Sequence, residues 1–374
     1  MIPLLYKADE SQFVTQGFGG LQEGRSIRVK RQVNGAYELE MQYPVSGRRF
    51  AELLPRRIIR ATAGPDEGAQ SFRIYRISKP LEGFCTVYAR HLAYDLMGYT
   101  LRPFTANSLA EATQQLQSGA AIQAHGFSIR ATFDRATACG SVTPRSVWSM
   151  LGGQKGSLLD IYGAEWEFDN TTCTLKERLG ADLGVTVRYG VNLQTLEQEE
   201  NLANTWTGVQ PYWQSTDGLT VVTLPEDILS TGEFDYTRVL VLDLSAEWPE
   251  PPTEEQLRSR TRQYITDNKV GIPAVGLDVK FLPLDQTEEY KGRNFLQKIH
   301  LGDTVSVEFP TAYDRATGAP RAFVMASARA VETVWLPLEE KYESVRLGEK
   351  RASFVSALAQ VQKNTAWLMT KVGR

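Results

Sequence analysis

The chain has 374 residues, of which 42% are hydrophobic and 23% charged, and its 44 acidic and 41 basic residues give a net charge of −3. This length predicts two to four domains of an ordinary globular protein. The near-neutral charge lacks the basic footprint of a nucleic-acid-binding protein, so any DNA that passes the chain is expected to pass without tight binding.

The first hundred residues predict β-structure. In residues 26–43, Asn34 and Gly35 separate two alternating runs, and this pair is typical of a type I′ hairpin turn. Alternate residues of the second run would share one buried face: Tyr37, Leu39, Met41 and Tyr43. We interpret residues 1–104 as a first β domain, with further strands at 56–62, 71–78 and 84–92.

The composition changes near residue 105. Ser108 and Glu111 have the spacing of a capping box and predict a helix over 108–117. Residues 143–190 then alternate short helical and strand patterns. We therefore interpret 105–190 as an α+β domain inserted between β regions.

The sequence GGQKGS at residues 152–157 has the composition of a phosphate-binding loop. A Walker loop carries its lysine after the last glycine, where the lysine reaches the phosphates from the start of a helix. Here Lys155 precedes Gly156, and a helical pattern leads into the loop. No phosphate site is predicted.

Helix-capping rules explain the same segment. Thr143 and Pro144 suit the start of a helix that Gly152 ends, and Ser157 suits the start of a second helix that Gly163 ends. The segment is therefore predicted to be a joint between two short helices.

β patterns return from residue 191. Thr253 and Gln256 have capping-box spacing and predict a helix over 253–268. We interpret 191–350 as a second β domain with this helix inserted. Its predicted strands are runs bounded by glycine, proline or acidic turns, at 218–225, 236–245, 274–284, 302–309 and 321–335.

The two β regions have a similar order of elements. Residues 56–92 give two strands, then Pro80-Leu81-Glu82, then a third strand, and residues 302–347 give two strands, then Pro337-Leu338-Glu339, then a third. We therefore hypothesise that the chain contains two related β domains. Unrelated strand orders in the two regions would show this hypothesis to be wrong.

Residues 351–374 carry apolar side chains at spacings of four and three, which is a heptad pattern. It suits either an amphipathic helix packed on its own domain or a short coiled coil between chains. Thr365 is an imperfect member of the seam. The apolar members are Phe354, Leu358, Val361, Leu368 and Val372.

No catalytic or metal-binding set stands out, and we predict no catalytic residue, metal or cofactor. The cysteines and histidines lack the spacing of a zinc or disulfide framework: Cys85, Cys139, Cys173, His91, His125 and His300. The acidic run at 196–201 suits either a pair of glycosidase carboxylates or, as we expect, a solvated face. The aromatic residues that follow suit a sugar groove or, as we prefer, packing: Trp206, Tyr212 and Trp213.

Five long stretches resemble, in order, the N-terminal region of phage tail-tip proteins of the prophage tail endopeptidase family, also called tail-associated lysins. These stretches are RQVNGAYELEMQYPVSG and residues 72–96, 143–170, 184–213 and 301–309. The resemblance implies a mainly β, baseplate-hub-like fold with two related β-barrel domains, an α+β domain and a C-terminal helix. It also implies a homotrimer whose six barrels form a pseudo-sixfold ring in the virion tail tip or baseplate.

The same resemblance implies the partners of such a hub. These would be the distal tail protein, the tail tube protein, the tape-measure protein and a downstream fibre or spike. Phage DNA would pass through the lumen, and the host cell surface would be reached indirectly. In the trimer, the apolar residues of 351–374 would hold three helices together.

The peptidase domains that give the family its name lie further downstream in longer members, so no enzyme activity is expected of this chain. Two alternatives to the structural hub stay open at this stage. They are a cell-wall peptidase or glycosidase, and a tail protein that binds carbohydrate on the host surface.

Overall fold

The computed structural model describes residues 1–78, 80–188, 193–201, 205–268, 270–271, 274–281, 299–313 and 320–348. The chain is mainly β and forms two compact units. The first runs to Glu197 and resumes at Asp278, and the second comprises Gln198–Leu277. Within the ranges given, none of the helices has the length and apolar character needed to cross a membrane.

The N-terminal strands form one part of a large sheet, in the order β3-β4-β7-β6-β5-β1-β2. As predicted, alternate residues of β4 are buried, and Glu40 and Gln42 between them are exposed. A short helix, η1 (Phe50–Glu52), follows β4. The strands are β1 (Leu4–Tyr6), β2 (Gly19–Gly20), β3 (Arg25–Gln32), β4 (Tyr37–Pro44), β5 (Ile58–Ala61), β6 (Gln70–Ser78) and β7 (Phe84–His91).

The predicted hairpin between β3 and β4 is confirmed, but the predicted turn type is wrong. A type I′ turn needs positive φ at both central residues, and only Asn34 has it, at 50°. The Gln32 amide donates to the Ala36 carbonyl at 2.8 Å. The loop therefore has three residues, Val33, Asn34 and Gly35.

A second set of six strands repeats the order of the first. It runs β15-β22-β23-β24-β21-β16. Read from β1 and without β2, the first set runs β1-β5-β6-β7-β4-β3. When the strands of each set are numbered from one to six in chain order, both sets have the order 1-4-5-6-3-2. Pro80-Leu81-Glu82 and Pro337-Leu338-Glu339 both precede the sixth strand. The second set comprises β15 (Asp182–Arg188), β16 (Leu193–Asn201), β21 (Ala274–Phe281), β22 (Thr304–Tyr313), β23 (Pro320–Leu336) and β24 (Lys341–Gly348).

The matching orders support the hypothesis of two related β regions. One pair differs in direction, because β1 is antiparallel to β5 while β15 is parallel to β22. The structure also moves a predicted boundary. The predicted α+β domain at 105–190 includes most of β15, but β15 pairs with β22, more than a hundred residues away, and local composition cannot reveal such a pairing.

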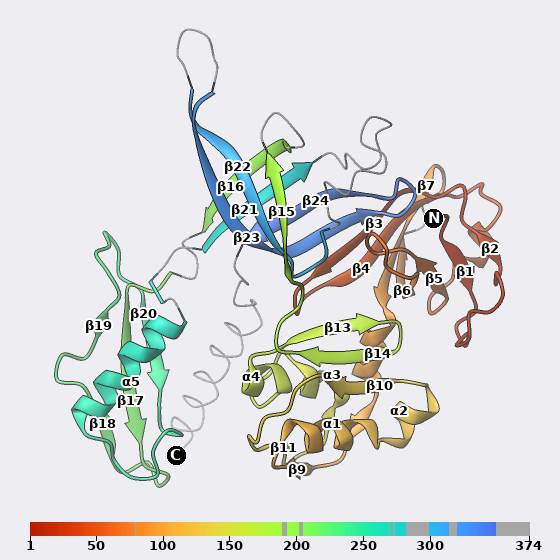
Figure 1. Cartoon of the computed structure of the whole chain (residues 1–374). Helices are drawn as coiled ribbons and strands as arrows, with labels where there is room; N and C mark the ends of the chain where they lie inside the picture. The colour runs from red at the N-terminus through yellow and green to blue at the C-terminus, as the bar shows by residue number, and fades with distance from the viewer. Residues whose placement is uncertain are drawn as a thin grey trace. The chain divides into compact units, whose positions relative to one another are not determined.

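β23 joins the two sets into one sheet. Its C-terminal half pairs with β24 on one side and with β3 on the other, from Glu332 opposite Gln32 to Trp335 opposite Val29. Trp335 is 4% exposed and packs in the core of the first set. Figure 1 shows β23, in blue, reaching the N-terminal strands, in red.

An α+β region lies between the two sets in sequence, with its own core. β8 and β9 pair with β12 and β11, so this region begins before the predicted boundary at residue 104. β14 lies between β10 and β13. The elements are η2 (Leu92–Gly98), β8 (Thr100–Leu101), β9 (Phe104–Ala106), α1 (Leu109–Gln117), α2 (Ala120–Ala124), β10 (Ser128–Ala131), β11 (Cys139–Ser141), β12 (Arg145–Ser146), α3 (Val147–Leu151), α4 (Leu158–Tyr162), β13 (Glu165–Asp169) and β14 (Thr172–Lys176).

The helix caps in this region follow the predictions with one exception. The Ser108 hydroxyl accepts from the Glu111 amide and begins α1 as expected. α3, however, is capped by Ser146 and not by Thr143. The strand pairing of Arg145 and Ser146 with β8 delays the start of the helix.

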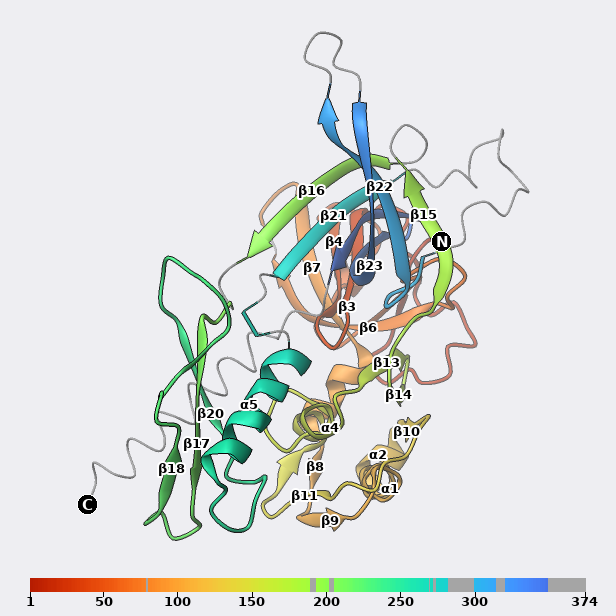
Figure 2. The same cartoon turned by 60° about the vertical axis from the view of Figure 1, so that its left-hand side comes forward.

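The second unit is a small sheet in which β17 pairs with β18, β19 and β20. The predicted helix is confirmed as α5, with a complete capping box between Thr253 and Gln256. Leu257 of α5 belongs to the same buried hydrophobic cluster as Val209 and Leu242 of the sheet, and Figure 2 shows α5 lying along the strands. This helix therefore belongs to a separate unit and does not merely interrupt the second β set. The remaining strands are β17 (Gly208–Gln214), β18 (Val221–Thr223), β19 (Leu229–Ser230) and β20 (Val239–Asp243), and the helix is α5 (Glu254–Asp267).

Candidate functional site

The five apolar residues predicted to form a trimer interface lie outside the described residues. They are Phe354, Leu358, Val361, Leu368 and Val372. The best-defined polar site in the first unit is instead a junction, where both β sets meet the α+β region.

Asn34 fastens the β3–β4 hairpin to the α+β region. Its side-chain amide donates to the Ala164 carbonyl at 2.9 Å, and its side-chain oxygen accepts from the Trp166 amide at 2.8 Å. The side chain therefore pairs with the edge of β13 as another strand residue would. The positive φ of Asn34 places the amide at the tip of the turn, a conformation that Asn tolerates better than most residues.

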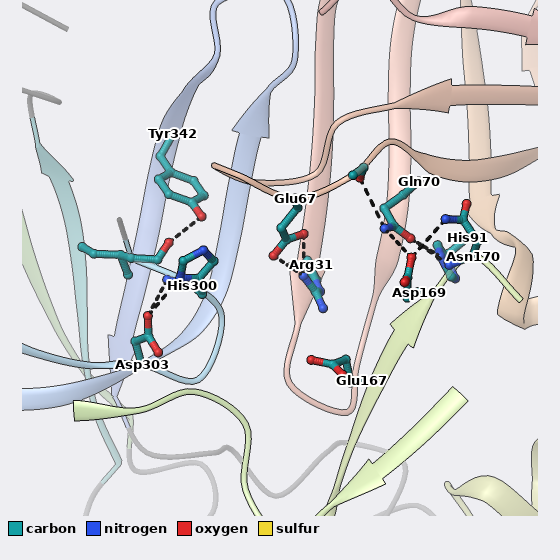
Figure 3. Close-up of polar contacts among 12 residues, drawn as sticks. Arg31, Glu67, Gln70, His91, Glu167, Asp169, Asn170, His300, Asp303 and Tyr342 are labelled. Atoms are coloured by element: carbon teal, nitrogen blue, oxygen red, sulfur yellow. Dashed lines mark hydrogen bonds and ion pairs between the residues drawn. The ribbon is translucent and has the colours of Figure 1, made fainter. Parts of the chain in front are cut away.

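Gln70 forms a second fastening, with the turn between β13 and β14. Its side-chain oxygen accepts from the Asn170 amide at 2.9 Å, and its nitrogen donates to Asp169 Oδ1 at 3.0 Å. The Ser71 hydroxyl donates to Asn170 Oδ1 at 2.8 Å. Figure 3 shows the side chains of Gln70, Asp169 and Asn170 lying together, with dashed lines between them.

His91 completes this network as a neutral side chain. Its Nδ1 accepts from the Ala93 amide at 3.3 Å, so Nε2 carries the proton and donates to Gln70 Oε1 at 3.1 Å. The ring is 1% exposed and stacks on Tyr37 with 4.3 Å between centroids. Burial, reinforced by the charge of Arg31, lowers the pKa of His91 to about 3. His91 is therefore a buried structural histidine.

Glu165 and Arg329 connect the α+β region to the second β set. Arg329 donates from Nη1 and Nη2 to the two carboxylate oxygens of Glu165, each at 2.8 Å. Arg329 also donates to the carbonyls of Leu179 and Gly302 at 3.0 and 3.2 Å. The Glu165 side chain is 7% exposed and that of Arg329 21%. This paired geometry compensates the cost of burying two charges.

Two glycines allow the backbone to cross closely beside this pair. A Cβ on Gly180 would lie 2.1 Å from the carbonyl carbon of Gly302, and the φ of Gly180 is 71°. The carboxylate of Asp303 secures the crossing by accepting from the amides of Ala181 and His300, at 2.8 and 2.7 Å. No side chain larger than hydrogen fits at Gly180.

A cavity of about 600 Å³ opens at the junction. Its charged groups are already paired: Arg31 with Glu67 at 2.9 Å, Lys176 with Glu167 at 2.8 Å, and Asp303 with backbone amides. The cavity therefore presents satisfied ion pairs to solvent rather than an open set of acids or bases. Its charged lining includes Arg31, Glu67, Glu167, Asp169, Lys176 and Asp303.

The three cysteines and His91 are buried, and His300 lies 3.4 Å from the Asp303 carboxylate. Cys85, Cys139 and Cys173 are buried and form no disulfide. Burial raises the pKa of Cys173 to about 12, which keeps the thiol protonated and unreactive. Among the residues that the structure describes, no three His, Cys, Asp or Glu side chains gather as metal ligands would.

The GGQKGS segment contains a carboxylate where a phosphate would have to bind. The Ser157 hydroxyl accepts from the Asp160 amide at 3.3 Å, and the Asp160 carboxylate accepts from the Gly156 amide at 2.8 Å. The carbonyl of Lys155 accepts from Arg145. Gly163 ends α4 with a φ of 62°, as predicted.

The acidic run at 196–201 lies on β16, and the side chains of residues 196–201 are outside the described part of the chain. The aromatic residues after it pack, as preferred from the sequence. Trp213 is 3% exposed and donates to the Trp248 carbonyl at 3.0 Å. The Arg238 guanidinium lies 4.6 Å from the centre of the Trp206 ring.

The fold is similar to those of solved proteins, although no sequence match is found. No family model and no curated protein matches the chain. Among solved structures, it is similar to a prophage tail protein, gp18, from Listeria monocytogenes EGD-e, with 16% identity, a TM-score of 0.54 and coverage of 97% of this chain and 99% of that one. The chain has a tail-protein fold.

Two further tail proteins show the same likeness. A tail protein from Neisseria meningitidis MC58 is 12% identical with a TM-score of 0.56, covering 93% of this chain and 96% of that one. A 43 kDa tail protein of prophage MuSo2 from Shewanella oneidensis is 13% identical with a TM-score of 0.53, covering 94% and 98%. The phage tail fold expected from the sequence is therefore confirmed. The narrower assignment to the tail endopeptidase family stays a prediction.

Proposed function

We propose that this chain is the structural hub of a phage or phage-like tail tip, in which three copies form a ring that caps the tail tube. The tail-protein fold supports the proposal, and the repeated strand order of the two β sets carries it. Three chains with two like sets each present six like units. Such a ring can meet a sixfold tube on one side and a threefold spike or fibre on the other.

In this proposal each strand set forms one barrel-like domain of the ring. The junction of Asn34, Gln70, Glu165 and Arg329 then holds the two sets of one chain in fixed register through the α+β region. A rigid register suits a ring, because small errors in the angle between units would accumulate and prevent closure. The helix predicted at 351–374 would bring three chains together near the axis.

The partners of the hub follow from its position in the tail. We propose contacts with the tail tube protein, the distal tail protein and the tape-measure protein, and with a fibre or spike below. The net charge of −3 suits a lumen that lets DNA pass without gripping its phosphates. The host cell surface would be reached through the fibre or spike.

We propose that the role is structural and not enzymatic. The carboxylates at the junction are held by ion pairs or backbone amides, and burial holds the thiol of Cys173 in its protonated form. Peptidoglycan zymography with the purified chain, with and without a chelator, tests this point. A clear zone of lysis that disappears on changing a Cys, a His or an acid of 197–200 would favour a lysin instead.

Light scattering of the full chain, alone and with the tail tube protein, tests the hub itself. The expected species has three times the mass of one chain and binds the end of the tube. A chain that stays monomeric at high concentration, and also after the tube protein is added, would argue against a hub.

A further inference from the structure

The repeat lets one contact inside the chain predict another between chains. Counted in chain order, β23 is the fifth strand of its set and β6 is the fifth of the other, while β3 and β16 are both second strands. Inside the chain, β23 pairs with β3. The equivalent pair, β6 with β16, is absent from the pairing of the described strands.

Among the described residues, no strand lies beside the edge of β6 beyond Ile74. β5 pairs with Gln70 to Arg73 only, and the last backbone bonds on that side are those of Ile74 with Arg56 and Arg57. Beyond Ile74, the strand pairs with β7 alone among the described residues. Aligning Pro80-Leu81-Glu82 with Pro337-Leu338-Glu339 puts Tyr75–Ser78 on the very positions, Glu332–Trp335, that pair with β3.

The local backbone of the two strands also matches. The pairing of β6 with β7 shifts register between Ile74 and Arg76, and that of β23 with β24 shifts between Ala330 and Glu332, one position away in the alignment. β16, in turn, is the last strand in the order of the sheet, with β21 on one side (Figure 2). Within the described residues, the C-terminal part of β6 and the outer side of β16 are thus two different unpaired edges, and such edges are templates for strand addition.

The charges of the two edges are complementary. Inside the chain a basic strand meets acids: Lys30 pairs with Glu332 and Arg28 with Glu343, each at 2.9 Å. At β6 the sign is reversed, because Arg76 is exposed beside Tyr88, its guanidinium 3.8 Å from the ring centre. The sequence of β16 supplies acids: Glu197, Glu199 and Glu200.

We propose that β16 of one chain adds as a strand to Tyr75–Ser78 of a second copy, and that this head-to-tail contact closes the ring of the proposed hub, on which the inference rests. Because the two edges differ, the contact is heterologous and forms a ring when the rotation closes. The reversed charges also keep basic β3 from occupying the basic edge of β6 in its place. In this contact, the acidic residues of β16 would face the basic edge of β6.

Charge reversal tests the contact. Arg76→Glu is expected to raise the concentration at which the three-chain species half dissociates by about tenfold, because each of three contacts loses one exposed ion pair and gains a repulsion. Arg102→Glu makes the same charge change at an exposed position away from the edge and is expected to leave the midpoint unchanged. Circular dichroism verifies that both variants fold.

Rescue tests the register. Glu199→Arg and Glu200→Arg occupy opposite faces of a strand, so one of them, and not the other, is expected to restore assembly in the Arg76→Glu background. Arg76→Cys is combined in turn with Gln198→Cys and with Glu199→Cys, and oxidation of one of these two double variants is expected to give covalent dimers and trimers, whereas the single variants give none. The three native cysteines are buried and form no disulfide.

The outcomes separate this inference from the proposed function. If the wild type forms the three-chain species while Arg76→Glu assembles equally well and no covalent ladder forms, the contact lies elsewhere and the hub proposal stands. If the wild type remains a single chain even with the tail tube protein, both proposals are overturned.

Discussion

Arg329→Met removes a guanidinium that forms a two-bond ion pair with the Glu165 carboxylate. The change deletes four hydrogen bonds of Arg329, two of them to a Glu165 side chain that is 7% exposed and also accepts from the Leu179 amide at 2.7 Å. Breaking one side of a buried pair costs roughly 3–5 kcal/mol. Arg329 is 21% exposed, so we expect the lower end, about 3 kcal/mol, which is a factor of about 100 in a local opening equilibrium.

Hydrogen exchange of the backbone amides of Leu179 and Ala181 reports that opening, because both amides bond across the junction. Adding Glu165→Gln to Arg329→Met removes the buried charge that Arg329 no longer compensates, so the double variant is expected to recover more than about 1 kcal/mol. Lys341→Met, which removes an exposed pair, serves as the control. Exchange in Arg329→Met within about twofold of wild type would refute the reasoning.

Three further changes probe the same junction. Neutral His91 contributes its full stabilisation above pH 6.5, and this contribution is lost as the pH falls toward its folded pKa of about 3. In urea unfolding, the free energy of unfolding of the wild type should therefore fall by about 2 kcal/mol from pH 7 to pH 5. His91→Gln is expected to abolish this fall. Gly180→Ala is expected to cost at least about 2 kcal/mol in thermal unfolding, since its Cβ would meet the Gly302 backbone. Asn34→Gly keeps the positive φ but deletes the bonds to Ala164 and Trp166, so we expect a loss of about 2 kcal/mol in urea unfolding. Asn34→Asp, which keeps the bond from the Trp166 amide, is expected to lose less than Asn34→Gly.

Each of these three predictions has a control or an outcome that would contradict it. Gly126→Ala has a φ of 69° with open space around its Cβ, so it measures strain alone, and an equal loss at Gly180 would contradict the close crossing. An unchanged acid slope in His91→Gln would show that another group titrates. An Asn34→Gly variant as stable as wild type would show that the hairpin docks without its amide.

Local features of the fold were readable from the sequence because their causes are local. Ser108, Ser157 and Thr253 cap helices as expected, since a capping hydroxyl bonds an amide three residues away. The buried face of β4 follows from the period of a strand. The Pro-Leu-Glu repeat also located equivalent strands correctly, because it sits at one fixed place in each set.

Long-range features were not readable. Asn34 was assigned to turn geometry alone, because nothing nearby shows that its amide meets Trp166, 132 residues away. Glu165 and Arg329 are unremarkable in the sequence and are joined only by folding. α3 begins after Ser146 and not after Thr143, because Arg145 and Ser146 pair with β8 as a strand. The close crossing of Gly180 and Gly302 likewise could not be predicted, because in the sequence the two residues look like any other glycines.

Electron microscopy of the isolated tail tip, averaged along the tail axis, tests the hub most directly. We predict three copies of the chain in one ring, with six β sets around the axis at the end of the tube. A tip that contains this chain in one or two copies, or in copies away from the axis, would contradict a hub built from two repeated β sets.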